Sequence, residues 1–170
     1  MRFVIIGNSG SGKSVLAASL SAIHALSSLD LDTIAWVPGT VGVPRDPVEA
    51  VADVNRFCTE HQDFVLEGCY ADLARAALAF RPTLIFLDAD AALCEKHCRQ
   101  RPFEPHKYAA PEIQDSKLQF LLEWVRGYYT REDSMSRSAH LALFEAYDGP
   151  KARFRGEMTV NGAGDIIEGI

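Results

Sequence analysis

Short hydrophobic runs recur along the chain and are separated by longer stretches of mixed character. RFVII at 2–6 has the composition of a buried parallel strand, and DFVLEG at 63–68 and TLIFLDAD at 83–90 repeat that character. LDLDTIAW at 29–36 and RGEMTVN at 155–161 are further β-rich segments. We therefore expect five strands, one in each of these segments.

The segments between the strands have helical patterns. A stripe of residues at helical spacing predicts a helix after the first strand: Val15, Leu16, Ser19, Leu20, Ile23 and Leu26. Asp46, followed by Pro47 and Glu49, predicts a capped helix that runs to about His61. Further helices are expected at 71–80, at 91–101 with Asp90 as the N-cap, and at 111–147, where a break near Thr130 fits the pattern.

Strands that alternate with helices predict an α/β fold with a parallel sheet and right-handed crossovers. Ligands of such sheets bind beyond the carboxyl ends of the strands. The informative positions are therefore those that follow each strand: 7–14, 30–36, 67–70, 88–90 and 161–164.

Composition narrows the class of protein. The chain has 170 residues, 48% hydrophobic and 24% charged, so we expect one domain over 1–170. A net charge of −6 argues against direct nucleic-acid binding. The start MRFVIIGNSG does not resemble a signal peptide, and no apolar run is long enough to span a bilayer, so we expect a cytoplasmic protein without membrane contact.

The four cysteines are consistent with the reduced thiols expected of a cytoplasmic protein. Cys94 and Cys98 lie one helical turn apart with His97 beside Cys98, which raises a metal or redox interpretation. No C-x-x-C pair is present, however, and the spacing of metal ligands is missing. Reduced thiols packed on a helix are the favoured interpretation for these residues and for Cys58 and Cys69.

The strongest chemical signal is GNSGSGKS at 7–14, which we call the glycine loop. It fits G-x-x-x-x-G-K-[ST] in full, follows a strand and opens an amphipathic helix. Glycines let successive amides curl into an anion nest at a helix N-terminus, Lys13 adds a cation for the β- and γ-phosphates, and Ser14 offers a hydroxyl to Mg²⁺. We expect the nucleotide to contact Gly7, Asn8, Ser9, Gly10, Ser11, Gly12, Lys13, Ser14 and Val15.

Four segments together resemble a known family: VIIGNSGSGKS, LDLDTIAWVPG, FVLEGCY and TLIFLDAD…CRQR. They are similar to the P-loop nucleotide and shikimate kinase group of the adenylate-kinase-like branch. More narrowly, they resemble the bacterial topology modulation protein-like ATP-binding proteins. The resemblance covers roughly residues 1–100 and only the outline of the rest. It implies a three-layer P-loop fold with sheet order 2-3-1-4-5, helices on both faces and a helical lid.

The resemblance extends to the acceptor side of the site. Asp30 and Asp32 fall on one face of the expected strand at 29–36 and resemble the D-x-D of shikimate kinases. This implies that Asp30 serves the metal through water, while Asp32 holds and helps to deprotonate the acceptor hydroxyl. A solvated strand end, with Asp30 capping a turn, is the alternative.

Other residues are assigned to the acceptor and the metal. Glu67 offers oxygen ligands to Mg²⁺, and Gly68 would let the acceptor approach the backbone. EGCY replaces the glycine run of shikimate kinases, which counts against shikimate as the acceptor. Trp36 either stacks on a substrate ring or packs. Arg45, in an acceptor-binding region at about 37–62, either grips an acceptor carboxylate or phosphate or lies at the surface.

A lid is implied at about 99–112. Arg99, Arg101 and Lys107 would close over the triphosphate, although a basic helix C-terminus is the alternative explanation for them. Asn161, after the last strand, would lie near the adenine.

The sequence thus predicts a kinase that transfers the γ-phosphoryl of Mg²⁺-ATP to a nucleoside, nucleotide or small hydroxylated metabolite. Lys13, Asp32, Arg99 and Arg101 are the expected catalytic residues. ATP rather than GTP follows from the resemblance and from the lack of an N-K-x-D motif. The alternative is a nucleotide-binding regulatory or DNA-topology-associated protein, or a simple ATPase. We expect a monomer or a homodimer.

Overall fold

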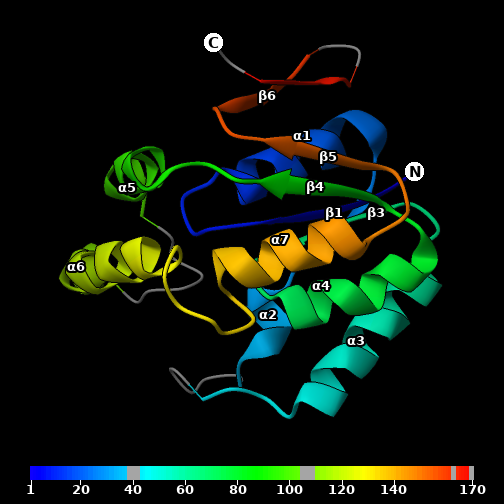
Figure 1. The fold of residues 1–170 in the computed structure, drawn as a ribbon, viewed down its shortest axis with the longest axis horizontal. Helices are drawn as coiled ribbons and strands as arrows, with labels where there is room; N and C mark the ends of the chain where they lie inside the picture. Colours follow the sequence, from blue (N-terminus) through cyan, green and yellow to red (C-terminus); the bar gives the residue numbers. More distant parts are fainter. Residues whose placement is uncertain (38–42, 104–109, 162–163, 169–170) are drawn as a thin grey trace.

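A five-stranded parallel sheet forms the centre of the protein, in the order β2-β3-β1-β4-β5. The computed structural model describes residues 1–37, 43–103, 110–161 and 164–168 (Figure 1). The strands are β1 (Arg2–Gly7), β2 (Ser27–Asp30), β3 (Phe64–Gly68), β4 (Thr83–Leu87) and β5 (Lys151–Phe154). The predicted strand order 2-3-1-4-5 is confirmed.

Helices cover both faces of the sheet (Figure 1). Side chains of β1 alternate between two hydrophobic clusters because successive residues of a strand point to opposite faces. Ile5 packs toward α1 (Lys13–His24), whereas Val4 and Ile6 pack toward the other face. That face is covered by α3 (Pro47–Glu60), α4 (Ala71–Ala77), which continues into the 3₁₀ turn η1 (Leu78–Phe80), and α7 (Arg137–Ala146). The result is the expected three-layer α/β fold.

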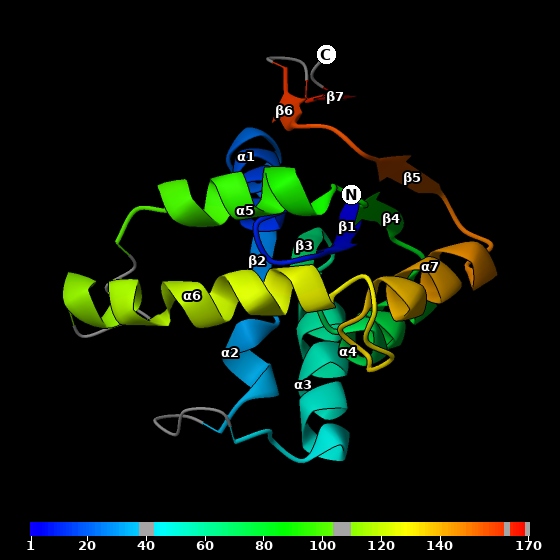
Figure 2. The same cartoon turned by 60° about the vertical axis from the view of Figure 1, so that its left-hand side comes forward.

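Helices α5 (Ala91–Gln100) and α6 (Pro111–Gly127) pack against each other through Cys94, Cys98, Leu122 and Val125 (Figure 2). Arg126 of α6 also binds both carboxylate oxygens of Glu95 of α5 at 2.7 Å. The expected lid at about 99–112 connects these two helices, and its residues 104–109 lie outside the described part of the chain.

Three local predictions are confirmed. Asp46 caps α3, since its side chain accepts from the Val48 amide at 2.7 Å. Asp90 caps α5 in the same way, at 2.8 Å from the Leu93 amide. The long helical region is broken between α6 and α7, over a segment that includes Thr130.

The prediction of a strand over 29–36 was wrong. β2 ends at Asp30, and residues 32–35 form the short helix α2 (Asp32–Ala35). The cause is the Asp30 side chain, whose Oδ1 accepts from the Asp32 amide at 2.9 Å and turns the chain out of the sheet. Asp30 and Asp32 therefore do not share one strand face.

The prediction of a fifth strand over 155–161 was also wrong. The strand beside β4 is β5, and Met158–Val160 forms β6, which pairs antiparallel with β7 (Ile166–Glu168) in a separate hairpin. Asp88, at the end of β4, explains the placement of β5. Its buried carboxylate accepts from Arg153 of β5 and, at 2.7 and 2.9 Å, from Arg137 of α7.

The charge on Asp88 is stabilised by those two arginines. Burial raises the pKa of the Asp88 carboxyl, but the hydrogen bonds and positive charges of Arg137 and Arg153 outweigh this and lower the pKa. The carboxylate thus stays ionised and joins three elements. Within the described residues, no helix is both long and apolar enough to cross a membrane.

Candidate nucleotide and acceptor site

The three glycines of the glycine loop, Gly7, Gly10 and Gly12, all have positive φ. Gly10 and Gly12 have φ of +78° and +96°, in the left-handed region. A Cβ on Gly10 would lie 2.3 Å from the Cys94 carbonyl oxygen of α5, so this glycine permits close packing of the loop on α5. A Cβ on Gly12 would meet no atom within 4 Å, so the space at the N-terminus of α1 is open there.

Lys13 bends back over the loop. Its ammonium nitrogen donates to the Asn8 carbonyl oxygen at 2.9 Å, and the residue is only 9% exposed. Asn8 is held in turn by its side-chain amide, which donates to the Val125 carbonyl of α6 at 3.0 Å. The Ser11 hydroxyl is buried and has no hydrogen-bond partner among the described residues. A cation, an unpaired hydroxyl and a helix N-terminus together suit an anionic ligand.

The loop opens into a cavity of about 510 Å³, a volume typical of small-molecule sites. Residues from the ends of three strands and from α5 meet there. The described lining consists of Ser9, Gly10, Ser11, Gly12, Lys13, Ser14, Val15, Asp30, Asp32, Glu67, Gly68, Cys69, His97, Gln100, Arg101, Pro102, Glu157 and Met158. Twelve of these are residues that the sequence assigned to the site; Gly7 and Asn8 lie outside the lining.

The oxygen ligands expected for Mg²⁺ lie together. Ser14 Oγ donates to Glu67 Oε1 at 2.6 Å, and Asp30 stands opposite Glu67 in the register of β2 and β3. Among the described residues, no three His, Cys, Asp or Glu side chains form a metal cluster. Mg²⁺ in kinases is held by one or two carboxylates together with phosphates and water, so this donor set fits it.

Asp32 is held by a residue that the sequence reasoning missed. Tyr70, directly after β3, donates from its hydroxyl to Asp32 Oδ1 at 2.7 Å and accepts from Trp36 Nε1 at 2.8 Å. The tyrosine of EGCY follows a strand end, which is the signal that could have identified it. Trp36 lies outside the cavity lining and uses its indole nitrogen on Tyr70.

Two other residues that the sequence assigned to the acceptor contact other parts of the protein. A Cβ on Gly68 would lie 2.7 Å from the Leu31 side chain, so the missing side chain makes room for Leu31, although Gly68 also lines the cavity. Arg45 lies outside the cavity lining. It donates to Asp53 at 2.7 Å and lies 3.7 Å from Glu49, so these two carboxylates of α3 neutralise it.

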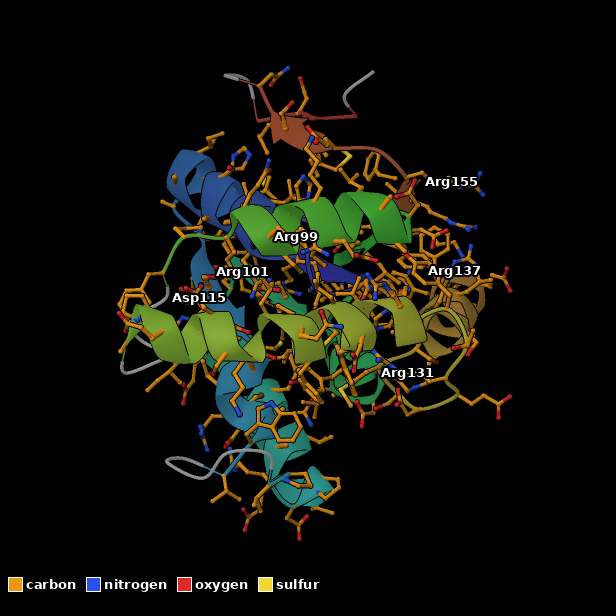
Figure 3. All side chains as sticks on the ribbon, turned by 90° about the vertical axis from the view of Figure 1, so that its left-hand side faces the viewer. Arg99, Arg101, Asp115, Arg131, Arg137 and Arg155 are labelled. Carbon is orange, nitrogen blue, oxygen red and sulfur yellow. The ribbon has the colours of Figure 1, made fainter. Side chains whose placement is uncertain are left out.

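The two lid arginines differ in position (Figure 3). Arg99 is 54% exposed, lies 3.7 Å from Glu95 and is not part of the cavity lining described above. Arg101 lines the cavity. The positions of the two side chains therefore favour Arg101 for contact with a ligand. Lys107 lies outside the described residues.

His97 and Glu157 were not predicted as site residues. His97 Nδ1 lies 2.8 Å from the Gly10 carbonyl oxygen, and its Nε2 lies 3.3 Å from Glu157 Oε1. Glu157 also pairs with Lys96 at 3.0 Å. This cluster links α5, the glycine loop and the segment before β6. No local motif marks these residues, because folding brings them together from positions far apart in the chain.

Asn161 lies in the β6–β7 hairpin. Its amide donates to the Asp165 carbonyl at 3.0 Å, and Gly164 of the same turn packs against the ring of His24 at the last turn of α1. The glycine loop lies at the other end of α1. The contact of Asn161 with adenine therefore has no support from the described geometry.

The four cysteines are free thiols. Burial raises the pKa of the Cys94 thiol to about 12 and that of Cys69 to about 11, so both stay protonated at neutral pH. Cys98 packs under Gly10 of the glycine loop. These observations agree with reduced, packed thiols.

Comparison with known proteins gives the fold. No protein-family model matches the sequence, and neither does any curated protein. A sugar kinase from Janibacter sp. HTCC2649 matches with a TM-score of 0.52 and 16% identity, over 91% of this chain and 84% of that chain. A shikimate kinase from Bacteroides thetaiotaomicron matches with a TM-score of 0.51 and 12% identity, over 96% and 91% of the two chains. The protein thus has the α/β fold of P-loop kinases.

Proposed function

We propose that this protein is a kinase that transfers the γ-phosphoryl group of Mg²⁺-ATP to a hydroxyl group of a small acceptor. The observation that carries the proposal is one cavity whose lining includes both residues 9–14 of the glycine loop, with Lys13, and Asp32. A triphosphate and a hydroxylated molecule need such a shared space to react.

The nucleotide is assigned to the glycine loop and the start of α1. The loop amides and Lys13 would bind the β- and γ-phosphates, and Arg101 would approach from the end of α5. Ser14 and Glu67 would hold Mg²⁺, with Asp30 acting on its water. When bound, Mg²⁺ would neutralise part of the charge on the phosphates. The choice of ATP follows from the family resemblance and from the lack of an N-K-x-D sequence.

Asp32 is assigned the role of the base that accepts the proton of the acceptor hydroxyl. The acceptor oxygen forms a bond to the γ-phosphorus while the bond from that phosphorus to the bridging oxygen breaks. ADP leaves with the bonding electrons, and the acceptor proton passes to the Asp32 carboxylate. Lys13 and Arg101 stabilise the negative charge on the transferred group.

The acceptor class is a nucleoside, a nucleotide or another small hydroxylated metabolite. The structural neighbours named above are a sugar kinase and a shikimate kinase, which is consistent with a small hydroxylated molecule. EGCY, in place of a glycine run, argues against shikimate itself. The narrower sequence resemblance is to the bacterial topology modulation protein-like ATP-binding proteins, and it does not name an acceptor.

An acceptor screen tests this function. Wild-type protein is incubated with labelled Mg²⁺-ATP and pools of nucleosides, nucleoside monophosphates, sugars and hydroxy acids. We expect a phosphorylated product in one pool. Asp32→Asn should lose that product and keep nucleotide binding, whereas Asp72→Asn, an exposed aspartate on α4, should keep both.

Tight nucleotide binding without a phosphorylated product in any pool would reject the kinase assignment. It would favour a regulatory nucleotide-binding protein, or an ATPase if phosphate is released.

A further inference from the structure

Three side chains form a directed chain of hydrogen bonds that ends on Asp32. Trp36 Nε1 lies 2.8 Å from the Tyr70 hydroxyl, which lies 2.7 Å from Asp32 Oδ1. An indole N–H is a donor only and an ionised carboxylate is an acceptor only. The direction is therefore fixed: Trp36 donates to Tyr70, and Tyr70 donates to Asp32.

Tyr70 is built to remain a donor. It is 7% exposed and packs in the main core cluster, with its ring 6.3 Å from the Trp36 ring in an edge-on arrangement. Burial and then the negative charge of Asp32 raise the pKa of the Tyr70 phenol, so it stays protonated at physiological pH.

Asp32 needs such support because of its position. It is the first residue of a helix of only four residues, and it is half-buried at the wall of the cavity. Its backbone amide is fixed by Asp30 Oδ1 at 2.9 Å. On its side chain, Oδ1 is held by the hydroxyl of Tyr70 at 2.7 Å.

We infer that Tyr70 is a positioning residue for Asp32: its hydroxyl holds one carboxylate oxygen and so fixes the direction in which the carboxylate faces the cavity. The inference rests on the proposed function, in which Asp32 takes the acceptor proton.

Trp36 strengthens this arrangement from the acceptor side. Donation to the oxygen of a hydroxyl makes that hydroxyl a better donor. Trp36 also forms an isolated antiparallel bridge with Pro44. The chain of hydrogen bonds thus links Asp32 to Trp36, which is bridged to Pro44.

The side-chain carboxyl-carbon resonance of Asp32, assigned with Asp32→Asn and recorded by NMR at constant pH, tests the inference. Tyr70→Phe should shift this resonance, because one carboxylate oxygen loses its hydrogen bond, and Trp36→Phe should shift it less. Tyr147→Phe is the matched control. Tyr147 is equally buried, at 7% exposure, and its hydroxyl donates to the Pro82 carbonyl at 2.6 Å, away from the cavity. This variant should leave the Asp32 resonance unchanged.

A second measurement needs no change at Tyr70. The chain has two tryptophans, and in Asp32→Asn the indole N–H resonance of Trp36 should shift from its wild-type position, while that of Trp124 should not. An unshifted Trp36 resonance would overturn the inference. So would an Asp32 resonance that is unchanged in Tyr70→Phe, or that moves equally in Tyr147→Phe.

Transfer kinetics then separate this inference from the proposed function. With an acceptor from the screen, Tyr70→Phe should lower kcat about tenfold and leave the KM for ATP unchanged, whereas Tyr147→Phe should change neither. A rise in the KM for ATP with kcat unchanged would contradict the positioning role. If the wild type transfers nothing but the resonances behave as expected, the kinase proposal fails and the link between Tyr70 and Asp32 stands.

Discussion

Ser14 Oγ, in the first turn of α1, donates a 2.6 Å hydrogen bond to Glu67 Oε1 at the end of β3. The bond joins the helix that follows the glycine loop to the neighbouring strand of the sheet. It also places a hydroxyl and a carboxylate side by side at the cavity wall. This is the donor set that we assign to Mg²⁺, and it leads to the first prediction.

Glu67→Gln should weaken nucleotide binding only when Mg²⁺ is present. The amide keeps the size of the side chain but loses the charge that attracts the metal. By calorimetry, we expect the affinity for nucleotide to fall about tenfold when Mg²⁺ is present, and to change little when a chelator has removed it. Ser14→Ala should behave similarly. The control is Ser19→Ala, which removes a hydroxyl farther along α1 that donates to the Val15 carbonyl. An equal loss with and without Mg²⁺ would contradict the assignment.

Gly10→Ala and Gly12→Ala should have different effects. Both substitutions place alanine in a left-handed backbone and should cost about 1 kcal/mol or more in the free energy of unfolding. Gly10→Ala should cost more, because its Cβ would meet the Cys94 carbonyl at 2.3 Å. Gly12→Ala should mainly reduce nucleotide affinity, since its methyl group would enter the open space at the helix N-terminus. Urea unfolding and calorimetry would measure the two effects, and equal destabilisation would argue against this packing.

His140 predicts a pH dependence of stability. It is fully buried and hydrogen-bonded to Tyr128 and to the Cys69 carbonyl, and burial lowers its pKa to about 4. The unfolded chain takes up a proton near pH 6.5, so the stability from the neutral ring is complete above that pH and is lost as pH falls toward 4. Between pH 7 and 5 the free energy of unfolding should fall by about 2 kcal/mol from this group.

Urea unfolding of His140→Gln at the two pH values tests this assignment. The amide can donate and accept in place of the ring but does not titrate, so the variant should lose this part of the pH dependence. His24→Gln, at the end of α1, should retain it. A His140→Gln variant with the full wild-type slope would assign the pH dependence to other groups.

Arg101→Ala should impair phosphoryl transfer far more than Arg99→Ala. Arg101 lines the cavity, whereas Arg99 points to Glu95 at the surface. We expect kcat to fall about 100-fold for Arg101→Ala and by no more than about threefold for Arg99→Ala, because only the former reaches charge that develops on the transferred group. Turnover with the acceptor identified in the screen measures this. Equal losses would place both arginines at the triphosphate.

The sequence predicted those features that depend on neighbouring residues. The glycine loop could be predicted because its glycines, Lys13 and Ser14 are all close together in the sequence, at the turn that leads into α1. The caps at Asp46 and Asp90 are local too. The order of the strands followed from the resemblance, because it is a property of the whole fold and not of any one segment.

Features that depend on long-range contacts were missed. β5 lies at 151–154 because Arg153 pairs with Asp88, and no local pattern encodes a bond across 65 residues. His97 meets Gly10 across 87 residues, and Tyr70 meets Asp32 across 38. An arginine in a loop is a reasonable candidate for binding an anionic ligand. In the fold, however, the charge of Arg45 is neutralised by Asp53 and Glu49. α2 replaced a predicted strand because the Asp30 side chain competes with the sheet for a backbone amide.

Calorimetric titration of Mg²⁺-ATP into wild-type protein and Lys13→Ala tests the central claim most directly. The account predicts Mg²⁺-dependent binding to the wild type that falls at least about 100-fold in Lys13→Ala, because the variant loses the buried ammonium group of the glycine loop. Unfolding curves of the two proteins should remain similar. Wild-type protein that binds no nucleotide, or a folded Lys13→Ala variant that binds as tightly as wild type, would contradict the account.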